Sequence, residues 1–358
     1  MSLLLSDEQR EFQNTLRSFF SEKFSSEVVR KRIERKSSSE TTFWSSLLEL
    51  GLSASFGSEN DEGFGLGSQE LSILAFESGY VLVPEPIVEH ALFGSLLLST
   101  LSSEITKSVL KARFGSDVLQ QIVGGSKRVT VVPAITVNQD IIIKSKTASG
   151  KFRFVPALEG ASYLVFTATH ERKRSVYIAQ IDKNLEYTEE DTLDRTIKRY
   201  QGALNSIDCE QLEISFELLQ QLEQTMIACQ IAGSAARAVA MTIEFVKQRK
   251  QFDVPVGGFQ AVQHRLADMY LASEAIRALS NFAAWAAHNS VDQLPLAAGS
   301  ALLFALEKGA QVVEGAIQLH GGIGFTWEYD LHLYLRRVKM LQALYRENSE
   351  ALIEQTSL

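Results

Sequence analysis

The feature that most constrains the fold is the helical patterning of the C-terminal part of the chain. From about residue 216 onward, apolar residues recur at helical spacing in four long runs that are joined by short segments. Long amphipathic helices with short links favour an antiparallel bundle, because each helix buries its apolar stripe against its neighbours. The sequence therefore predicts a four-helix bundle over 216–358. The four runs cover roughly 216–249, 258–289, 296–320 and 328–346.

The two preceding segments have different textures. Residues 123–215 contain short β-branched or aromatic runs such as "RVTVVPAI", "YLVFTAT" and "SVYIAQI", separated by polar turns, which predicts a small β domain. Residues 1–122 have helical patterns, one starting after the N-cap candidate Ser6 and another near Ser68, after the glycine-rich loop "GSENDEGFGLG". The predicted fold class is mostly α with a small β barrel or sheet between two helical domains.

Composition excludes several functions. A hydrophobic content of 45% supports a large core, and a formal net charge of -8 argues against nucleic acid as a partner. The two cysteines, Cys209 and Cys229, form neither a disulfide framework nor a metal-ligand spacing, so reduced thiols and no metal site are expected. The N-terminus lacks the basic region of a signal peptide, and the run "LPLAAGSALLFAL" is predicted to be too short to cross a bilayer. A cytoplasmic protein without a transmembrane segment is expected.

Two motifs on the predicted bundle could carry a function. The first, "RKQFDVPVGGFQ", starts at Arg249 and connects the first two helical patterns; the second, "QLHGGIGF", starts at Gln318 and ends the third pattern. Taken alone, each has a structural explanation, because Arg249 could interact with a helix C-terminus and a glycine could cap one. The alternative is that the guanidinium binds a phosphate and the glycines let a backbone approach a ligand. The two motifs together are more specific than either one.

Together the motifs resemble those of the acyl-CoA dehydrogenase family, over roughly residues 225–345. The resemblance implies an N-terminal helical domain, a middle β domain and a C-terminal four-helix bundle. It also implies that the chain binds FAD and acyl-CoA, forms a dimer or tetramer with itself or a homologous subunit, and passes electrons to an electron-transfer acceptor in lipid or fatty acid catabolism. The residues implied to contact FAD are Arg249, Gln251, Phe252 and Gln260, with Gln318, Gly321 and Gly322 reaching the FAD of a neighbouring subunit.

The family reaction needs a carboxylate that takes the α proton of the acyl thioester while the β hydride goes to flavin N5. The resemblance implies two positions for this glutamate. The commoner one falls on Tyr345 here, with Glu347 two residues further on. The other falls on Glu223, ten residues before Gly233 on the first bundle helix, with apolar residues one turn to either side. A carboxylate on an apolar face is unfavourable unless it is paired or functional. Glu223 is therefore the candidate catalytic base, and Glu347 is the second choice.

The chain departs from the family pattern at three points. Asp253 follows Phe252 where the family has glycine, Tyr345 replaces the commoner glutamate, and "VTVVPAITVNQD" lacks the Thr/Ser-Glu and Gly-Ser-Asp segment that supports the flavin ring and the thioester. Two alternatives therefore stay open. The chain could be a catalytically inactive homologue that acts as partner subunit of a heteromeric acyl-CoA dehydrogenase, or a flavin-free structural or acyl-binding helical protein.

Other charged residues are predicted to be structural. The run "THERKR", Thr169 to Arg174, is expected to be a solvated loop. Four polar residues of the last helical pattern are expected on the helix surface and in salt bridges: Glu328, Asp330, His332 and Arg337.

Overall fold

The computed structural model describes residues 5–34, 41–134, 141–170, 173–183 and 185–356, apart from the side chains of 41–42, 170 and 347–356. In space the chain forms two compact units. Unit 1 comprises 1–34, 68–83 and 224–358, and unit 2 comprises 35–67 and 84–223. Each unit therefore brings together segments that are distant in sequence. The predicted domains 1–122, 123–215 and 216–358 follow the order of the sequence, and their boundaries stay predictions.

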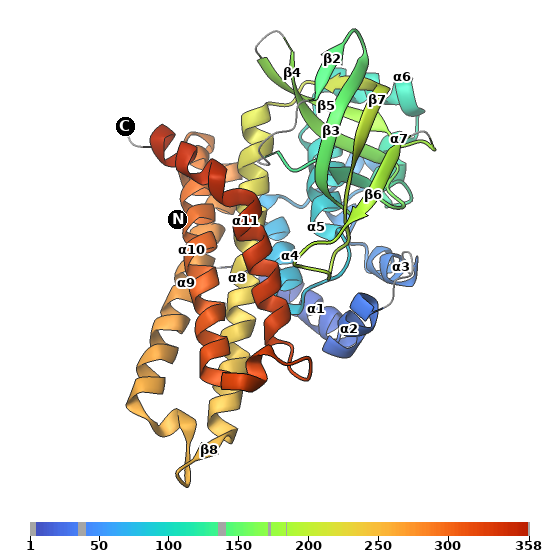
Figure 1. Ribbon diagram of the computed structural model, residues 1–358. Helices are drawn as coiled ribbons and strands as arrows, with labels where there is room; N and C mark the ends of the chain where they lie inside the picture. Colours follow the sequence, from blue (N-terminus) through green and yellow to red (C-terminus); the bar gives the residue numbers. More distant parts are fainter. Residues whose placement is uncertain (1–4, 35–40, 135–140, 171–172, 184, 357–358) are drawn as a thin grey trace. The chain divides into compact units, whose positions relative to one another are not determined.

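Unit 1 is built on long helices that run alongside one another (Figure 1). Helix α10 packs against both α9 and α11, and the shorter helix α4 contacts α1 and α9. The predicted N-cap at Ser6 is confirmed, since Ser6 and Gln9 form a reciprocal capping box at the start of α1. The helices are α1 (Asp7–Lys23), α2 (Ser26–Glu34), α4 (Ser68–Val81), α8 (Phe216–Gln248), α9 (Gln260–Asn289), α10 (Leu294–His320) and α11 (Leu331–Thr356).

Two glycines allow α4 and α8 to touch through their backbones. A Cβ on Gly79 would lie 2.0 Å from the carbonyl oxygen of Gln230, and a Cβ on Gly233 would lie 2.0 Å from that of Phe76. Real side chains do not occupy such positions, so each helix needs a glycine where it meets the other. The hydroxyl of Ser234 donates to the carbonyl of Gly79 at 3.1 Å and adds a hydrogen bond to this crossing.

Two helical segments of the chain are long and apolar enough to cross a membrane. They are α8 and the segment Val291–Phe325, and 72% and 61% of their most apolar windows are buried inside the protein. The expectation that the run after Leu294 is too short was wrong, because it belongs to the 27-residue helix α10. Burial within unit 1 explains its apolar character, as expected of a core helix.

Unit 2 contains the β domain and several short helices. Strand β4 pairs with β2 and β5, and the pairings continue through β3 and β7 back to β5, so five strands form a closed ring. Strand β1 adds in parallel to β4, and β6 adds to β7. The strands are β1 (Val129–Val131), β2 (Ile142–Lys144), β3 (Thr147–Pro156), β4 (Tyr163–His170), β5 (Lys173–Gln180), β6 (Glu186–Glu190) and β7 (Arg199–Leu212). The helices are α3 (Thr41–Glu49), α5 (Ile87–Glu89), the π-helix η3 (His90–Thr100), α6 (Glu104–Phe114) and α7 (Val118–Val123).

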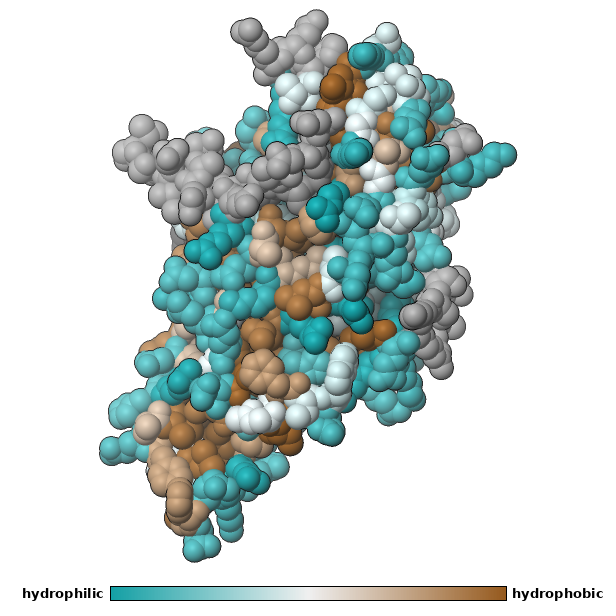
Figure 2. Space-filling model, in the orientation of Figure 1, coloured by the Kyte–Doolittle hydropathy of each residue, from teal (hydrophilic) through white to brown (hydrophobic). Residues whose placement is uncertain are grey.

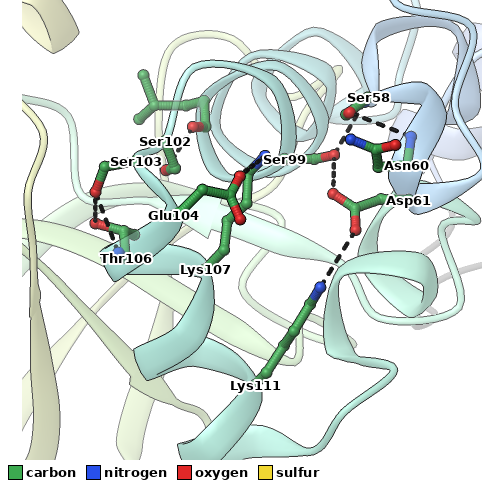
Figure 3. Close-up of polar contacts among 11 residues, drawn as sticks. Ser58, Asn60, Asp61, Ser99, Ser102, Ser103, Glu104, Thr106, Lys107 and Lys111 are labelled. Atoms are coloured by element: carbon green, nitrogen blue, oxygen red, sulfur yellow. Dashed lines mark hydrogen bonds and ion pairs between the residues drawn. The ribbon is translucent and has the colours of Figure 1, made fainter.

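A buried carboxylate organises the glycine-rich loop of unit 2 (Figure 3). Asp61 accepts a hydrogen bond from Ser99 of η3 at 2.7 Å, and Lys111 of α6 lies 3.9 Å from its other oxygen. The same Ser99 hydroxyl accepts from the backbone N–H of Ser58 at 2.9 Å. The loop is therefore attached to two helices through one acidic side chain.

A buried histidine links η3 to the first strand. The Nδ1 atom of His90 accepts from the backbone N–H of Val129 at 3.0 Å, and its Nε2 lies 2.8 Å from the hydroxyl of Ser53 and 3.1 Å from the carbonyl of Ile122. These contacts fit the neutral tautomer with its proton on Nε2. Burial, together with the positive charge of Arg128, lowers the pKa of His90 to about 4.

Candidate functional site

The first sequence motif forms a tight hairpin at the end of α8. Strands β8 (Lys250–Gln251) and β9 (Val254–Pro255) pair in antiparallel fashion around a two-residue turn. Both turn residues have positive φ, 51° at Phe252 and 64° at Asp253, as a type I′ turn requires. Aspartate tolerates this region better than most residues, whereas a bulky phenylalanine there is strained. The strain is a reason to look for a function at this turn.

The other residues of this motif are presented to the outside. Arg249, just after α8, has an exposed side chain for which the described part of the chain provides no ion-pair partner. Gln251 is exposed and donates to the carbonyl of Lys250 at 2.9 Å, and Gln260 is exposed as the first residue of α9. Phe252 is 89% exposed, and its ring contacts only the neighbouring ring of Phe259 among the described aromatic pairs, at 6.5 Å. This motif is thus available for binding.

The second motif ends α10 at the same end of unit 1. Gly321 caps the helix with φ 65°, and its N–H bonds to the carbonyl of Gln318, so the capping explanation is correct for this residue. Gly322 has no positive φ, and a Cβ on either glycine would meet no atom within 4 Å. The ring of Phe245, near the end of α8, stacks on His320 at 4.2 Å. This contact brings the two motifs to one end of the bundle (Figure 1).

Both motifs have large exposed apolar side chains at or next to them, which together are here called the bundle-end surface. Figure 2 shows apolar side chains gathering over the lower ends of the helices in the view. Large exposed apolar groups are uncommon on a monomer and indicate a surface that a ligand or another chain covers. Its members are Phe252, Val254, Phe259, Ile323, Phe325 and Trp327, which are 38–89% exposed.

This end of unit 1 fits FAD by the chemistry of its groups. Arg249 offers a guanidinium for a diphosphate, and Gln260 and Gln318 offer amides for polar groups of a dinucleotide. The open side of Gly321 and Gly322 leaves room for a planar group or a backbone to approach. Asp253 is the one acidic residue of the turn, and it weakens the attraction for a diphosphate.

Glu223, the candidate base, lies in unit 2 near the start of α8. The residue is 4% exposed, and its Oε2 accepts a hydrogen bond from the backbone N–H of Ala134 at 3.0 Å. Ala134 follows β1 within the segment "VTVVPAITVNQD", where the resemblance places the support for the flavin ring and the thioester. The remaining part of that segment, 135–140, lies outside the described residues. The carboxylate thus contacts the segment of the β domain where the resemblance places the flavin support.

The second candidate base and the commoner glutamate position lie on α11. Tyr345 is only 3% exposed, so the phenol that stands at this position packs inside the protein. Glu347 is part of α11, but its side chain lies outside the described residues.

The structure corrects two expectations about charged residues. His332 and Arg337 are 5% and 2% exposed, so they are not on the helix surface, although Asp330 does form an ion pair with Arg30 at 2.5 Å. The run "THERKR" is not a loop throughout, because Arg174 belongs to β5, but the exposure of Lys173 and Arg174 agrees with the expectation that the run is solvated. Arg174 donates to the carbonyl of Ala134 at 3.2 Å and interacts electrostatically with Glu223. No pattern in the sequence marked Arg174, since a charge run looks the same whether it is solvated or partly buried.

Comparison with known proteins agrees with this geometry. The family model for "Acyl-CoA dehydrogenase, C-terminal domain" matches residues 219–345. Among curated proteins, acyl-CoA dehydrogenase IpdE2 of Mycolicibacterium smegmatis is 28% identical over 339 residues, which is 93% of each chain. The protein of the same name from Mycobacterium tuberculosis is 42% identical over 112 residues, 31% of this chain and 33% of that protein.

Solved structures of this family share the fold along the whole chain. The steroid ACAD Tcur3481-Tcur3483 has a TM-score of 0.86 and 26% identity, and the alignment covers 98% of this chain and 99% of that one. Butyryl-CoA dehydrogenase from Megasphaera elsdenii has a TM-score of 0.82 and 20% identity over 99% of this chain and 98% of that one. Residues 219–345 thus match the C-terminal domain of the acyl-CoA dehydrogenase family, and the chain as a whole is similar to members of that family. Both the resemblance inferred from the motifs and the predicted fold class are confirmed.

Proposed function

We propose that the chain is a subunit of an FAD-dependent acyl-CoA dehydrogenase that removes the α proton and the β hydride of an acyl thioester. FAD, when bound, supplies the oxidant that accepts the hydride at N5. Glu223 takes the α proton. The observation that carries the proposal is the position of this carboxylate, buried and in contact with Ala134 of the β domain. Burial keeps water away from the carboxylate, as proton abstraction from carbon requires.

The bundle-end surface is proposed to hold the cofactor of another subunit, because Arg249 follows Glu223 along α8 at a distance of roughly 39 Å, which is too far for both to serve one site. Arg249, Gln251, Phe252 and Gln260 bind FAD, and Gln318 with Gly321 and Gly322 approach the FAD of a neighbouring subunit. Two similar solved structures bear the names of two chains, Tcur3481-Tcur3483 and the ChsE4-ChsE5 complex from Mycobacterium tuberculosis, the latter with a TM-score of 0.84 and 20% identity over 99% of this chain and 98% of that one. They support an oligomer, formed with identical or homologous subunits. We also propose a cytoplasmic location, an acyl-CoA substrate and an electron-transfer acceptor.

Substitution of the base tests the activity. Glu223→Gln keeps the shape of the side chain and removes its ability to take a proton, so flavin reduction by acyl-CoA should slow by about 10²–10⁴-fold. The measurement is anaerobic stopped-flow absorbance of the flavin with a panel of acyl-CoA thioesters, with flavin content as the check on binding. Glu217→Gln, on the exposed first turn of the same helix, is the matched control. If Glu223→Gln is reduced as fast as the parent, the base lies elsewhere, and Glu347→Gln is the next variant.

A second candidate function is supported by Tyr345, which is buried where most family members have their glutamate. In this case the chain is a partner subunit that completes the flavin site of a homologous chain and has no base of its own. Purification alone and with a co-expressed homologous chain separates the two functions. A partner subunit should bind FAD stoichiometrically and show reduction by acyl-CoA only in the hetero-oligomer. Absence of any flavin spectrum in both preparations would point to the flavin-free alternative.

A further inference from the structure

Ala134 is held on both of its backbone polar groups by side chains of opposite charge. Its N–H donates to the Oε2 atom of Glu223 at 3.0 Å, and its carbonyl accepts from a guanidinium nitrogen of Arg174 at 3.2 Å. Glu223 lies near the start of α8 and Arg174 lies on β5, so two separate elements meet at Ala134. The guanidinium also lies over the ring of Phe216 at 4.3 Å, on the same helix as Glu223.

The burial of Glu223 makes its charge state depend on these contacts. A carboxylate that is 4% exposed loses most of its hydration, and without compensating partners burial favours its protonated form. A protonated acid has no capacity to abstract a proton from carbon. A nearby guanidinium and a backbone N–H both favour the ionised form. Arg174 is itself partly desolvated, and Glu223 is the charged group that offsets this effect on the pKa of Arg174.

We propose that Arg174 is a positioning residue of the dehydrogenation, which keeps Glu223 ionised and fixes the Ala134 peptide that this carboxylate contacts. The inference rests on the proposed function, in which Glu223 takes the α proton. Arg174 acts through Glu223 and makes no contact with the substrate in this role.

Other charged groups also lie on β5 and at the start of α8. Lys173 precedes it on β5, and its charge is among the influences that lower the pKa of Glu217, behind hydrogen bonds to the Ser215 side chain and to the backbone of Glu217 itself. Lys173, Arg174 and Glu217 are all exposed, and the feature that distinguishes Arg174 is its hydrogen bond to the carbonyl of Ala134, the residue that Glu223 contacts. Within the described residues, the electrostatic partner of Arg174 is Glu223.

The test is a titration of Glu223 in the holoenzyme without substrate. Infrared difference spectra of protein labelled with ¹³C in its glutamate side chains follow the carboxylate band, and Glu223→Gln identifies the band of this residue. We expect the midpoint to rise by about one to three pH units in Arg174→Met. Arg174→Lys keeps the charge but not the fork geometry, so its midpoint should rise less. Arg195→Met removes an exposed arginine that bonds to Asp191 in the same unit, and its midpoint should equal that of the parent.

A second measurement is the pH profile of flavin reduction by acyl-CoA. Its acidic limb should move to higher pH in Arg174→Met by the same amount as the titration, which a merely structural arginine would not cause. An unchanged midpoint in both Arg174 variants overturns the inference. If Arg174→Met does not fold, Arg174→Lys decides alone, since a rise supports the inference and an unchanged midpoint contradicts it. Full activity of Glu223→Gln would instead reject the assigned base, whatever the titration shows.

Discussion

Two pairs of glycines in unit 1 serve opposite needs. Gly79 and Gly233 lie where α4 and α8 cross, and a Cβ on either would lie 2.0 Å from a backbone oxygen of the other helix. Gly321 and Gly322 follow α10, and a Cβ on either would meet nothing within 4 Å. The first pair is required by the packing of the chain itself. The second pair leaves space that the chain does not fill, which fits its proposed role beside a cofactor, although Gly321 also caps α10.

The largest expected effect comes from adding a methyl group at Gly79 or Gly233, the pair at the crossing of α4 and α8. Gly233→Ala and Gly79→Ala place a methyl group against backbone, and α4 and α8 must separate to admit it. We expect each to lower the free energy of unfolding by about 3 kcal/mol, the upper part of the usual range for overpacking. Urea denaturation followed by far-UV circular dichroism measures this change, with Gly322→Ala as the control. Equal stability of Gly233→Ala and Gly322→Ala would remove the distinction between the two pairs.

Substitutions on the bundle-end surface should instead change the affinity for FAD. Arg249→Ala removes a charged hydrogen-bond donor from the bundle-end surface, so FAD affinity should fall by about one to two decades, equivalent to roughly 1.5–3 kcal/mol. The unfolding free energy of the flavin-free protein should stay within about 0.5 kcal/mol of the parent, as expected for an exposed side chain. Fluorescence titration of the flavin-free protein with FAD gives the affinity. Unchanged FAD binding would make Arg249 a structural residue.

Substitution of Gly321 or Gly322 should give a smaller effect. Gly322→Ala should leave the isolated chain as stable as the parent but weaken flavin retention and oligomer formation by up to about tenfold, or 1.4 kcal/mol. Gly321→Ala should add a loss of about 1 kcal/mol in stability, because its φ of 65° disfavours a side chain. Sedimentation velocity at micromolar concentration, recorded at flavin and protein wavelengths, measures flavin retention and oligomer formation. A parent protein that is a stable monomer with intact flavin would contradict the neighbouring-subunit role of these glycines.

The smallest effect is expected at the turn of Phe252 and Asp253, which is proposed to face the cofactor. Asp253→Asn removes the negative charge and keeps a residue that tolerates φ 64°, whereas Asp253→Gly removes both the charge and the side chain. Both should tighten FAD binding by about two- to threefold at low salt, and the gain should disappear at about 1 M salt because the group is exposed. A gain seen only in Asp253→Gly would indicate that backbone strain, and not charge, limits binding.

The sequence was sufficient for features that depend on local spacing. Helical periodicity predicted the bundle helices, and the glycines after Gln318 predicted the end of α10. The binding surface inferred from the two motifs stays a prediction. The features that were missed depend on which distant segments meet. Gly79 lies in an ordinary helical pattern, and its role requires the presence of α8. Arg337 and His332 carry polar groups whose burial no spacing reveals, and Arg174 becomes informative only when β5 lies beside Ala134.

The buried His90 makes unit 2 sensitive to acid. The pKa of its imidazole is about 4 in the folded protein, mainly through burial, against an ordinary value of 6.5. The unfolded chain therefore binds a proton more readily than the folded one, and the stability that neutral His90 contributes is fully present above pH 6.5 and is lost as the pH falls toward 4. Protonation of Nδ1 removes the acceptor for the N–H of Val129, so acid weakens the connection between η3 and β1. A fall in pH toward 4 thus acts on the strand that leads to Ala134.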